Sequence, residues 1–245
     1  MISGRAAGVV DRAPILGFTA AEVRARLVIL SALVLAALLP MSILAVRITT
    51  FDDLTYSFLA WNLFLAGLPV AFAALAEVAW RFRRRVLTFG LLVGWLAFFP
   101  NAPYITTDLI HLRERPPVPI WFDALILNSA AVAGLLAGFV SLYLVHQMSE
   151  ERFGRIWGWA LCAAVLCVAS FGVYLGRFAR FNSWDIATAP REILYDVSER
   201  VGDPLTGSTA IAVTLSLTAF QLLSYIIIRS VGRLAAAPIP GVSRG

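Results

Sequence analysis

Asp108 and His111 are the residues of this chain whose types and spacing are best suited to chemistry. They lie three positions apart in the run FFPNAPYITTDLIHL, and on a helix this spacing brings a carboxylate and an imidazole to the same face. Such a pair predicts a catalytic site, with Asp108 as a base or metal ligand and His111 as its partner. The alternative is a histidine at the membrane interface that is hydrogen-bonded to Asp108 and has no chemical role.

These residues leave the cofactor unknown. A catalytic zinc usually has three protein ligands, and the second of the two histidines, His146, is expected at the opposite end of the following span. A site for a harder divalent cation, dominated by carboxylates, stays open. The sequence has no nucleotide-binding or haem motif.

A second polar group, GRFARFNSWD, occupies residues 176–185. Arginine binds carboxylate and phosphate through two parallel hydrogen bonds, so Arg177 and Arg180 are candidates for binding an anionic substrate. Asn182 and Asp185 are candidates to complete this site. The alternatives are arginines that reach lipid phosphate or form internal ion pairs, beside a turn that Asn182 and Asp185 help to form.

The third apolar stretch contains two prolines on either side of Asn101. Pro100 and Pro103 each remove an amide donor and clash with the preceding turn, so the helix is predicted to break at Pro100 to Pro103. Asn101, Thr106 and Thr107 can satisfy the freed backbone groups. The break predicts either a substrate or ion site or a kink that neighbouring helices close, and the prolines alone favour the kink.

The elements that carry these residues are predicted to be membrane-spanning helices. Of the 245 residues, 60% are hydrophobic and 14% are charged, whereas about 25% are charged in an average soluble domain. Apolar stretches long enough to cross the hydrocarbon core recur along the chain. The composition excludes a soluble globular protein and predicts an all-α, polytopic membrane protein. The six predicted spans are 27–46, 56–79, 86–99 with a broken continuation to 112, 122–145, 157–176 and 208–228.

These spans predict a single membrane domain, residues 27–228, between an N-terminal segment (1–26) and a C-terminal tail (229–245). Its outer loop, 177–207, contains the run REILYDVSERV, whose apolar residues fall on one helical face. The pattern predicts a short amphipathic helix on the membrane surface, acting as a lid or, more simply, as an anchor.

The arginines predict the orientation of the chain. All 20 basic residues are arginines, and the connections on alternate sides of the membrane carry 13 and 7 of them. Because basic loops remain in the cytoplasm, both termini are predicted to be cytoplasmic, together with the short turn that holds Arg81, Arg83, Arg84 and Arg85. The same rule accounts for the net charge of +5, so nucleic acid is not an expected partner.

This topology gathers polar residues at the outer face, because the third span ends, the fourth begins and the fifth ends there. Ionisable groups in or beside a bilayer are costly and are candidates for functional sites. The predicted catalytic residues are Asp108 and His111, and the predicted substrate-binding residues are Asn101, Asp123, Arg177, Arg180, Asn182 and Asp185.

Small and polar residues at helical spacing predict how the spans pack. The fourth span carries Ala130, Gly134 and Gly138, and the fifth carries Gly172 and Gly176, so both can approach other helices closely. In the sixth span, Thr214, Thr218, Gln221 and Tyr225 form one polar face. Such a face favours hydrogen bonds between helices over a permeation path.

Four motifs resemble a known family: WNLFLAGLP at 61–69, FFPNAPYITTDLIHL at 98–112, WFD at 121–123 and GRFARFNSWD at 176–185. They are similar to the bacterial integral membrane family catalogued as domain of unknown function 1361. The resemblance implies a multi-pass protein of the bacterial cytoplasmic (inner) membrane, and it supplies no substrate, cofactor or catalytic assignment. The positions that match its motifs are Asn62, Pro100, Asn101, Pro103, Tyr104, Asp108, His111, Asp123, Arg177, Asn182, Trp184 and Asp185.

Three functional hypotheses follow, and they leave open whether the protein is an enzyme. The outer polar residues could form an enzymatic site for a lipid-linked or periplasmic substrate, which predicts a cleft open to the outer leaflet. The broken helix could belong to a small transporter or channel subunit, which predicts a polar path past Asn62. The polar residues could instead be a structural ion-pair lock in an accessory or assembly protein. The lipid bilayer is the expected partner, with a homo-oligomer or another membrane protein as further possibilities.

Overall fold

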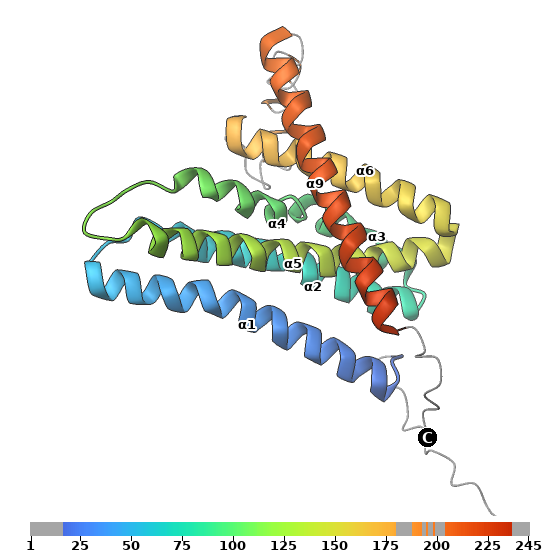
Figure 1. Cartoon of the computed structure of the whole chain (residues 1–245). Coiled ribbons are helices and arrows are strands. Elements are labelled where there is room, and N and C mark those ends of the chain that lie inside the picture. Colours follow the sequence, from blue (N-terminus) through green and yellow to red (C-terminus); the bar gives the residue numbers. More distant parts are fainter. Residues whose placement is uncertain (1–16, 180–187, 193–194, 196–197, 199–203, 237–245) are drawn as a thin grey trace, which may run out of the picture.

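A computed structural model describes residues 17–179, 188–192, 195, 198 and 204–236 of the chain. The described residues are helical and contain no β-strand (Figure 1). The helices are α1 (Ala20–Phe51), α2 (Phe58–Arg81), α3 (Arg85–Phe98), α4 (Asn101–Tyr104), the 3₁₀ helix η1 (Ile105–His111), α5 (Ile120–Phe153), α6 (Arg155–Tyr174), the π-helix η2 (Leu175–Ala179) and α9 (Pro204–Ala236).

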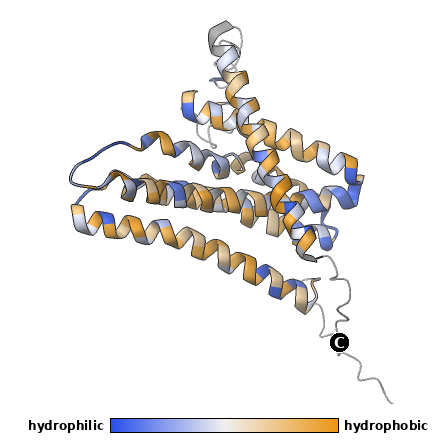
Figure 2. Cartoon of the chain, in the orientation of Figure 1, coloured by the Kyte–Doolittle hydropathy of each residue, from blue (hydrophilic) through white to orange (hydrophobic). Residues whose placement is uncertain are grey.

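Six candidate membrane spans confirm the predicted architecture. They comprise α1, α2, the segment from α3 to η1, α5, α6 with η2, and α9, each long and apolar enough to cross a bilayer. Figure 2 shows apolar residues along these helices and polar residues at the connections at both ends of the bundle. The protein is therefore a multi-pass helical membrane protein.

The helix α5 forms the centre of the bundle. In its most apolar stretch 61% of the residues are buried, against 11% in α1 and 17% in α9. It packs on α1, α2, α6 and η1. The peripheral helices α1 and α9 leave most of their apolar side chains exposed, as expected for surfaces that face lipid.

The third span breaks where the two prolines predict it. The helix α3 ends at Phe98, and the amide of Ala102 donates to the carbonyl of Phe99 instead of that of Phe98. The side chain of Asn101 takes its place and donates to the Phe98 carbonyl at 2.9 Å. Thr106 similarly donates to the Pro103 carbonyl at 2.7 Å. Polar side chains near the break thus satisfy backbone groups that a regular helix would satisfy itself.

Three glycines of the neighbouring helices enclose this break. A Cβ atom on Gly134 of α5 would lie 2.3 Å from the Ile105 side chain, and one on Gly138 would lie 2.9 Å from Ala102 Cβ. On α6, a Cβ atom on Gly172 would lie 3.1 Å from Pro100. The small residues therefore allow close packing, as their spacing predicts. The segment that packs against them is the broken third span. The geometry matches the simpler of the two expectations, a kink closed by its neighbours.

The polar face of α9 connects this helix to α5 and α6. Gln221 donates to the Ser170 hydroxyl at 2.8 Å, and the Tyr225 hydroxyl lies 3.0 Å from His146 Nδ1. Both Gln221 and Tyr225 are buried. These contacts are hydrogen bonds between helices, as the spacing of polar residues on this span favours.

The start of α1 and the end of α9 lie at the same end of the bundle, which an even number of spans requires (Figure 1). The apolar residues that define the predicted surface helix of the last loop, Ile193, Leu194, Val197 and Val201, lie outside the described residues, as do residues 1–16 and 237–245.

Candidate functional site

Arg177 and Asp108 form an ion pair at the predicted outer end of the bundle. Arg177 Nη2 lies 2.5 Å from Asp108 Oδ1, and the second carboxylate oxygen accepts a hydrogen bond from the Asn62 amide at 2.8 Å. The Asp108 side chain is 2% exposed and that of Arg177 is 11% exposed. Both oxygens of a buried carboxylate are therefore satisfied by groups from two other helical elements.

The same guanidinium binds His111. Arg177 Nη1 lies 3.1 Å from His111 Nε2. Because a guanidinium can only donate, Nε2 is the acceptor, and the neutral imidazole carries its hydrogen on Nδ1. The i,i+3 spacing brings Asp108 and His111 to a common partner, since residues three apart are aligned on a 3₁₀ helix. Arg177, rather than a direct bond, joins the two side chains.

Thr107 and Tyr104 complete the surroundings of this arginine. Thr107 Oγ1 accepts from Arg177 Nε at 2.9 Å and from Nη2 at 2.6 Å, while its own hydroxyl donates to the Tyr104 carbonyl. The guanidinium carbon lies 4.4 Å from the centre of the Tyr104 ring, within cation–π range. We call these six residues the Arg177 cluster: Asn62, Tyr104, Thr107, Asp108, His111 and Arg177.

Irregular helical segments present both halves of this cluster. Thr107, Asp108 and His111 lie on η1, the tightly wound continuation of the broken span, and Arg177 lies on the π-helix η2 at the end of α6. A π-helix widens the turn and changes the direction of its side chains relative to an α-helix, and such segments are frequent at functional sites. The prolines thus place the Asp108 carboxylate and the His111 imidazole, while η2 places the Arg177 guanidinium.

Asp123 belongs to a second group of charges, around Arg47. Arg47 is fully buried, and its Nε atom lies 2.7 Å from Asp123 Oδ1 while Nη2 lies 3.0 Å from Asp53 Oδ2. Its guanidinium carbon lies 4.9 Å from the centre of the Tyr56 ring. We call Arg47, Asp53, Tyr56 and Asp123 the Arg47 cluster. It joins the ends of α1 and α5 at the predicted outer face to the loop before α2.

The two clusters meet at the backbone of His111. The Tyr56 hydroxyl donates to the His111 carbonyl at 3.1 Å and accepts from Arg115 at 2.6 Å. Burial raises the pKa of Tyr56. The hydrogen bond from Arg47 holds the pKa of Asp53 well below its ordinary value. Asp53 is therefore ionised at neutral pH.

Comparison with known proteins identifies the family to which the chain belongs. A family model described as a protein of unknown function (DUF1361) matches residues 61–224. The chain belongs to this family. No curated protein and no solved structure matches the chain.

The DUF1361 match extends from α2 into α9 and so includes the whole Arg177 cluster. Of the predicted site residues, the structure brings Asp108, His111 and Arg177 together. Asp123 is buried in the Arg47 cluster instead, and Asn101 donates to the backbone of the break. Arg180, Asn182 and Asp185 lie outside the described residues.

Sequence reasoning did not identify Arg47, Tyr56 and Arg115 as partners of the predicted site residues. Arg47 carried a usable signal, because it lies at the end of an apolar span on the side where arginine is scarce. Tyr56 and Arg115 carried none, since a tyrosine and an arginine beside spans are ordinary at a membrane interface. Within the described ranges, no group of three or more His, Cys, Asp or Glu side chains is suitably placed to hold a metal ion.

Proposed function

We propose that this DUF1361 protein is an accessory or assembly protein of the membrane, in which the Arg177 cluster is a structural lock. The lock joins α2, the broken third span and the end of α6 at the outer face. The observation that carries the proposal is that each of the three guanidinium nitrogens of Arg177 contacts Asp108, Thr107 or His111 of the same chain.

The burial and the hydrogen bonds of Asp108 and His111 support this proposal over an open catalytic site. A catalytic base needs access to substrate, whereas both oxygens of Asp108 already accept hydrogen bonds and the side chain is 2% exposed. His111 Nε2 is likewise directed at Arg177. Buried charges are tolerated when they are paired and hydrogen-bonded in this way.

The lock is tested by breaking the ion pair from each side and then removing it entirely. Asp108→Asn and Arg177→Met each leave one buried group without its partner, so each is expected to lose roughly 3–5 kcal/mol of unfolding free energy. The double variant Asp108→Leu/Arg177→Met is expected to recover part of that loss, because two apolar side chains replace the pair while Asn62, Thr107 and His111 lose their partners. Equilibrium unfolding in mixed micelles measures all three.

Arg113→Gln is the matched control, since it removes one charge from an exposed arginine at the same end of the bundle. It should leave stability within about 0.5 kcal/mol of wild type. Single variants that unfold at the wild-type midpoint would show that the Arg177 cluster is not a lock.

A second candidate function is binding of a carboxylate or phosphate compound by Arg177, in an enzymatic site at the outer face. The π-helix at residues 175–179 favours this alternative, because π-turns are often retained where a side chain serves a ligand. Its test is a thermal-shift screen of wild type against Arg177→Lys with soluble carboxylates and phosphates. Binding predicts a compound that raises Tm in wild type and not in Arg177→Lys, which keeps the charge but loses the planar fork.

A further inference from the structure

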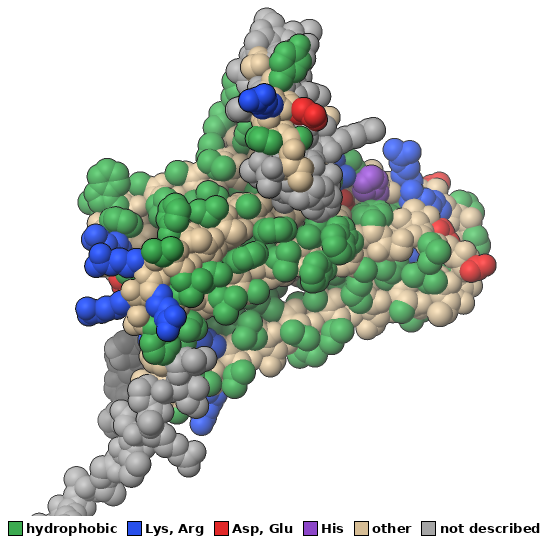
Figure 3. Space-filling view, turned by 180° about the vertical axis from the view of Figure 1, so that it is seen from behind, with side chains coloured by type: hydrophobic (Ala, Val, Ile, Leu, Met, Phe, Trp, Pro, Cys, Tyr) green, Lys and Arg blue, Asp and Glu red, His purple; other side chains and the backbone are tan. Residues whose placement is uncertain are grey.

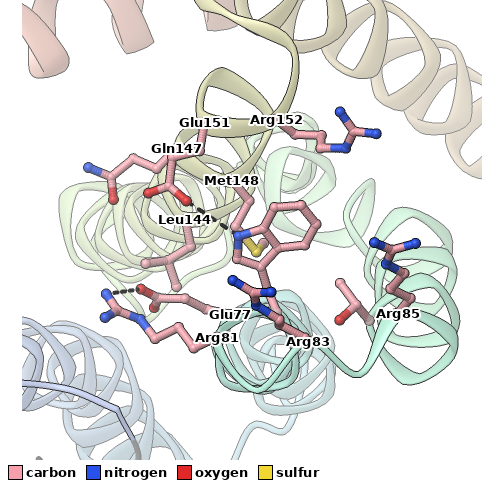
Figure 4. A pocket seen from close by; sticks show the side chains of 11 residues that line it. Glu77, Arg81, Arg83, Arg85, Leu144, Gln147, Met148, Glu151 and Arg152 are labelled. Carbon is pink, nitrogen blue, oxygen red and sulfur yellow. Dashed lines mark hydrogen bonds and ion pairs between the residues drawn. The ribbon is translucent and has the colours of Figure 1, made fainter.

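A pocket of about 630 Å³ lies at the opposite end of the bundle, between α2, α3 and α5. Four arginines contribute to its lining together with the apolar side chains of Leu144 and Met148 (Figure 4). Figure 3 shows that arginine side chains gather at this end of the molecule.

One of the four arginines is already engaged by the protein. Arg81 binds Glu77 at 3.3 Å, Glu22 at 2.9 Å and the Gly17 carbonyl at 3.0 Å. Glu77 also pairs with Arg26 of α1 at 2.5 Å. This network belongs to the packing of α1 on α2. It is not available to a ligand.

The other three arginines have no acidic partner among the described residues. Arg83, Arg85 and Arg152 take part in none of the ion pairs there, and the acidic residue nearest to Arg152 in sequence, Glu151, accepts a hydrogen bond from the Trp80 indole at 3.3 Å. In Figure 4 Arg85 and Arg152 lie on one side of the pocket, the Glu77–Arg81 pair lies on the other, and Arg83 lies between them. The pocket therefore presents three arginines without an acidic partner, together with the Glu151 carboxylate, beside an apolar surface.

The backbone of the α2–α3 turn adds a second observation. Arg83 has φ of 57°, in the left-handed region that glycine and asparagine adopt most readily. The amide of Arg83 donates to the Trp80 carbonyl and that of Arg84 to the Ala79 carbonyl, so the turn closes α2 tightly. An arginine occupies a position for which backbone geometry would select a smaller residue, and its side chain lines the pocket.

We propose that this pocket binds a phosphate group, carried by an anionic lipid of the adjacent leaflet or by a soluble phosphate compound. Guanidinium groups bind phosphate through planar, paired hydrogen bonds, and the three here lie in the α2–α3 turn, on α3 and on α5. Leu144, Met148 and the Trp80 ring offer an apolar surface for the glycerol or acyl portion of a lipid. The site is separate from the Arg177 cluster, so the proposal does not depend on the structural lock.

The neighbouring Arg84 provides a control that distinguishes a discrete site from a general attraction of arginines to anionic lipid. It lies between Arg83 and Arg85 in the sequence and is exposed at the same end, but it does not line the pocket. Both mechanisms predict that anionic lipid associates with this end. Only a discrete site predicts that Arg83 and Arg85 matter and Arg84 does not.

The test uses the full chain in nanodiscs that contain equal amounts of phosphatidylglycerol and phosphatidylcholine, with native mass spectrometry to count the lipids retained after release. We expect wild type and Arg84→Asn to retain phosphatidylglycerol equally. The variant Arg83→Asn/Arg85→Gln should retain at least about tenfold less, a loss consistent with two charge-assisted contacts. Asparagine accepts the left-handed conformation, so the turn is preserved. Arg152→Gln on α5 repeats the test from another element, independently of the turn.

A parallel arm distinguishes the source of the phosphate. Tm is measured in nanodiscs of phosphatidylcholine alone, with and without inorganic phosphate or glycerol phosphate. If phosphate or glycerol phosphate raises the Tm of wild type and of Arg84→Asn but not that of the other variants, the site binds soluble phosphate compounds. Equal lipid retention by all variants, or an equal loss in Arg84→Asn, overturns the proposal, as does a wild type that responds to neither lipid nor phosphate.

Discussion

Asp123 and Asp53 bind the same guanidinium but differ in exposure. Asp123 is 1% exposed and Asp53 is 32% exposed, while Arg47 between them is fully buried. Removing the charge of Asp123 leaves a buried arginine with a single, partly solvated partner. Asp123→Asn is therefore expected to lose roughly 3 kcal/mol or more of unfolding free energy.

Asp53→Asn is the matched comparison, because it removes a carboxylate from the same arginine where water can replace it. Its loss should be clearly smaller than that of Asp123→Asn in the same unfolding experiment. Equal losses would mean that burial does not determine the strength of these two pairs.

The lowered pKa of Asp53 also predicts how the stability of the fold depends on pH. Arg47 lowers the pKa of this carboxyl in the folded state below its ordinary value of 3.8. A lowered pKa stabilises the fold above the ordinary value, and that contribution is lost as the pH falls through the folded pKa. Between about pH 6 and about pH 3, wild type should therefore lose more Tm than Asp53→Asn. An equal fall in Tm for wild type and Asp53→Asn over this pH range would contradict the stabilising role of the Asp53 carboxylate.

At the residue scale, the sequence predicts which polar side chains share a face but not which of them pair. It places Asp108, His111 and Arg177 together because the spans that carry them end in the same compartment. Asp123 shares that compartment and binds Arg47 instead. The choice depends on the rotation of α1 and α5 about their axes, which apolar spans of low amphipathicity do not determine.

At the scale of elements, the contact between Gly134 and Ile105 limits how closely the broken span approaches α5. Alanine at this position would place its Cβ atom 2.3 Å from Ile105, which is fully buried. The chain must shift to relieve this contact, so Gly134→Ala is expected to lose about 1–3 kcal/mol. Thermal unfolding in the same detergent measures the loss.

Gly67 and Gly90 provide the matched controls, because each lies within a helix and a Cβ atom added there would meet nothing within 4 Å. Alanine there should leave stability unchanged or raise it by up to about 1 kcal/mol through helix propensity. A Gly134→Ala variant as stable as these controls would mean that the break tolerates a wider separation from α5.

The break itself was predictable, because proline lacks an amide hydrogen whatever surrounds it. The π-helix at 175–179 was not, since no residue in the run LGRFA requires a widened turn. Its geometry depends on contacts that Arg177 makes with residues about 70 positions earlier, and such contacts leave no periodic signal.

For the whole molecule, six spans place both termini on one side, and the arginine distribution predicts that this side is the cytoplasm. Single cysteines test the orientation in a background without Cys162 and Cys167. Arg84→Cys and Glu114→Cys replace exposed residues at opposite ends of the bundle. In intact cells, an impermeant maleimide should label Glu114→Cys, and it should label Arg84→Cys only after lysis. The opposite pattern would reverse the orientation.

The separation in sequence between Asp108 and Arg177 bears on how the chain is made. The two residues are 69 positions apart, so the third span is synthesised well before Arg177. This span is also the least apolar of the six. Asn62 lies 46 positions earlier and is already available, so its amide can hold the carboxylate until the arginine arrives. The ion pair of the third span is therefore completed only after the end of α6 has been made.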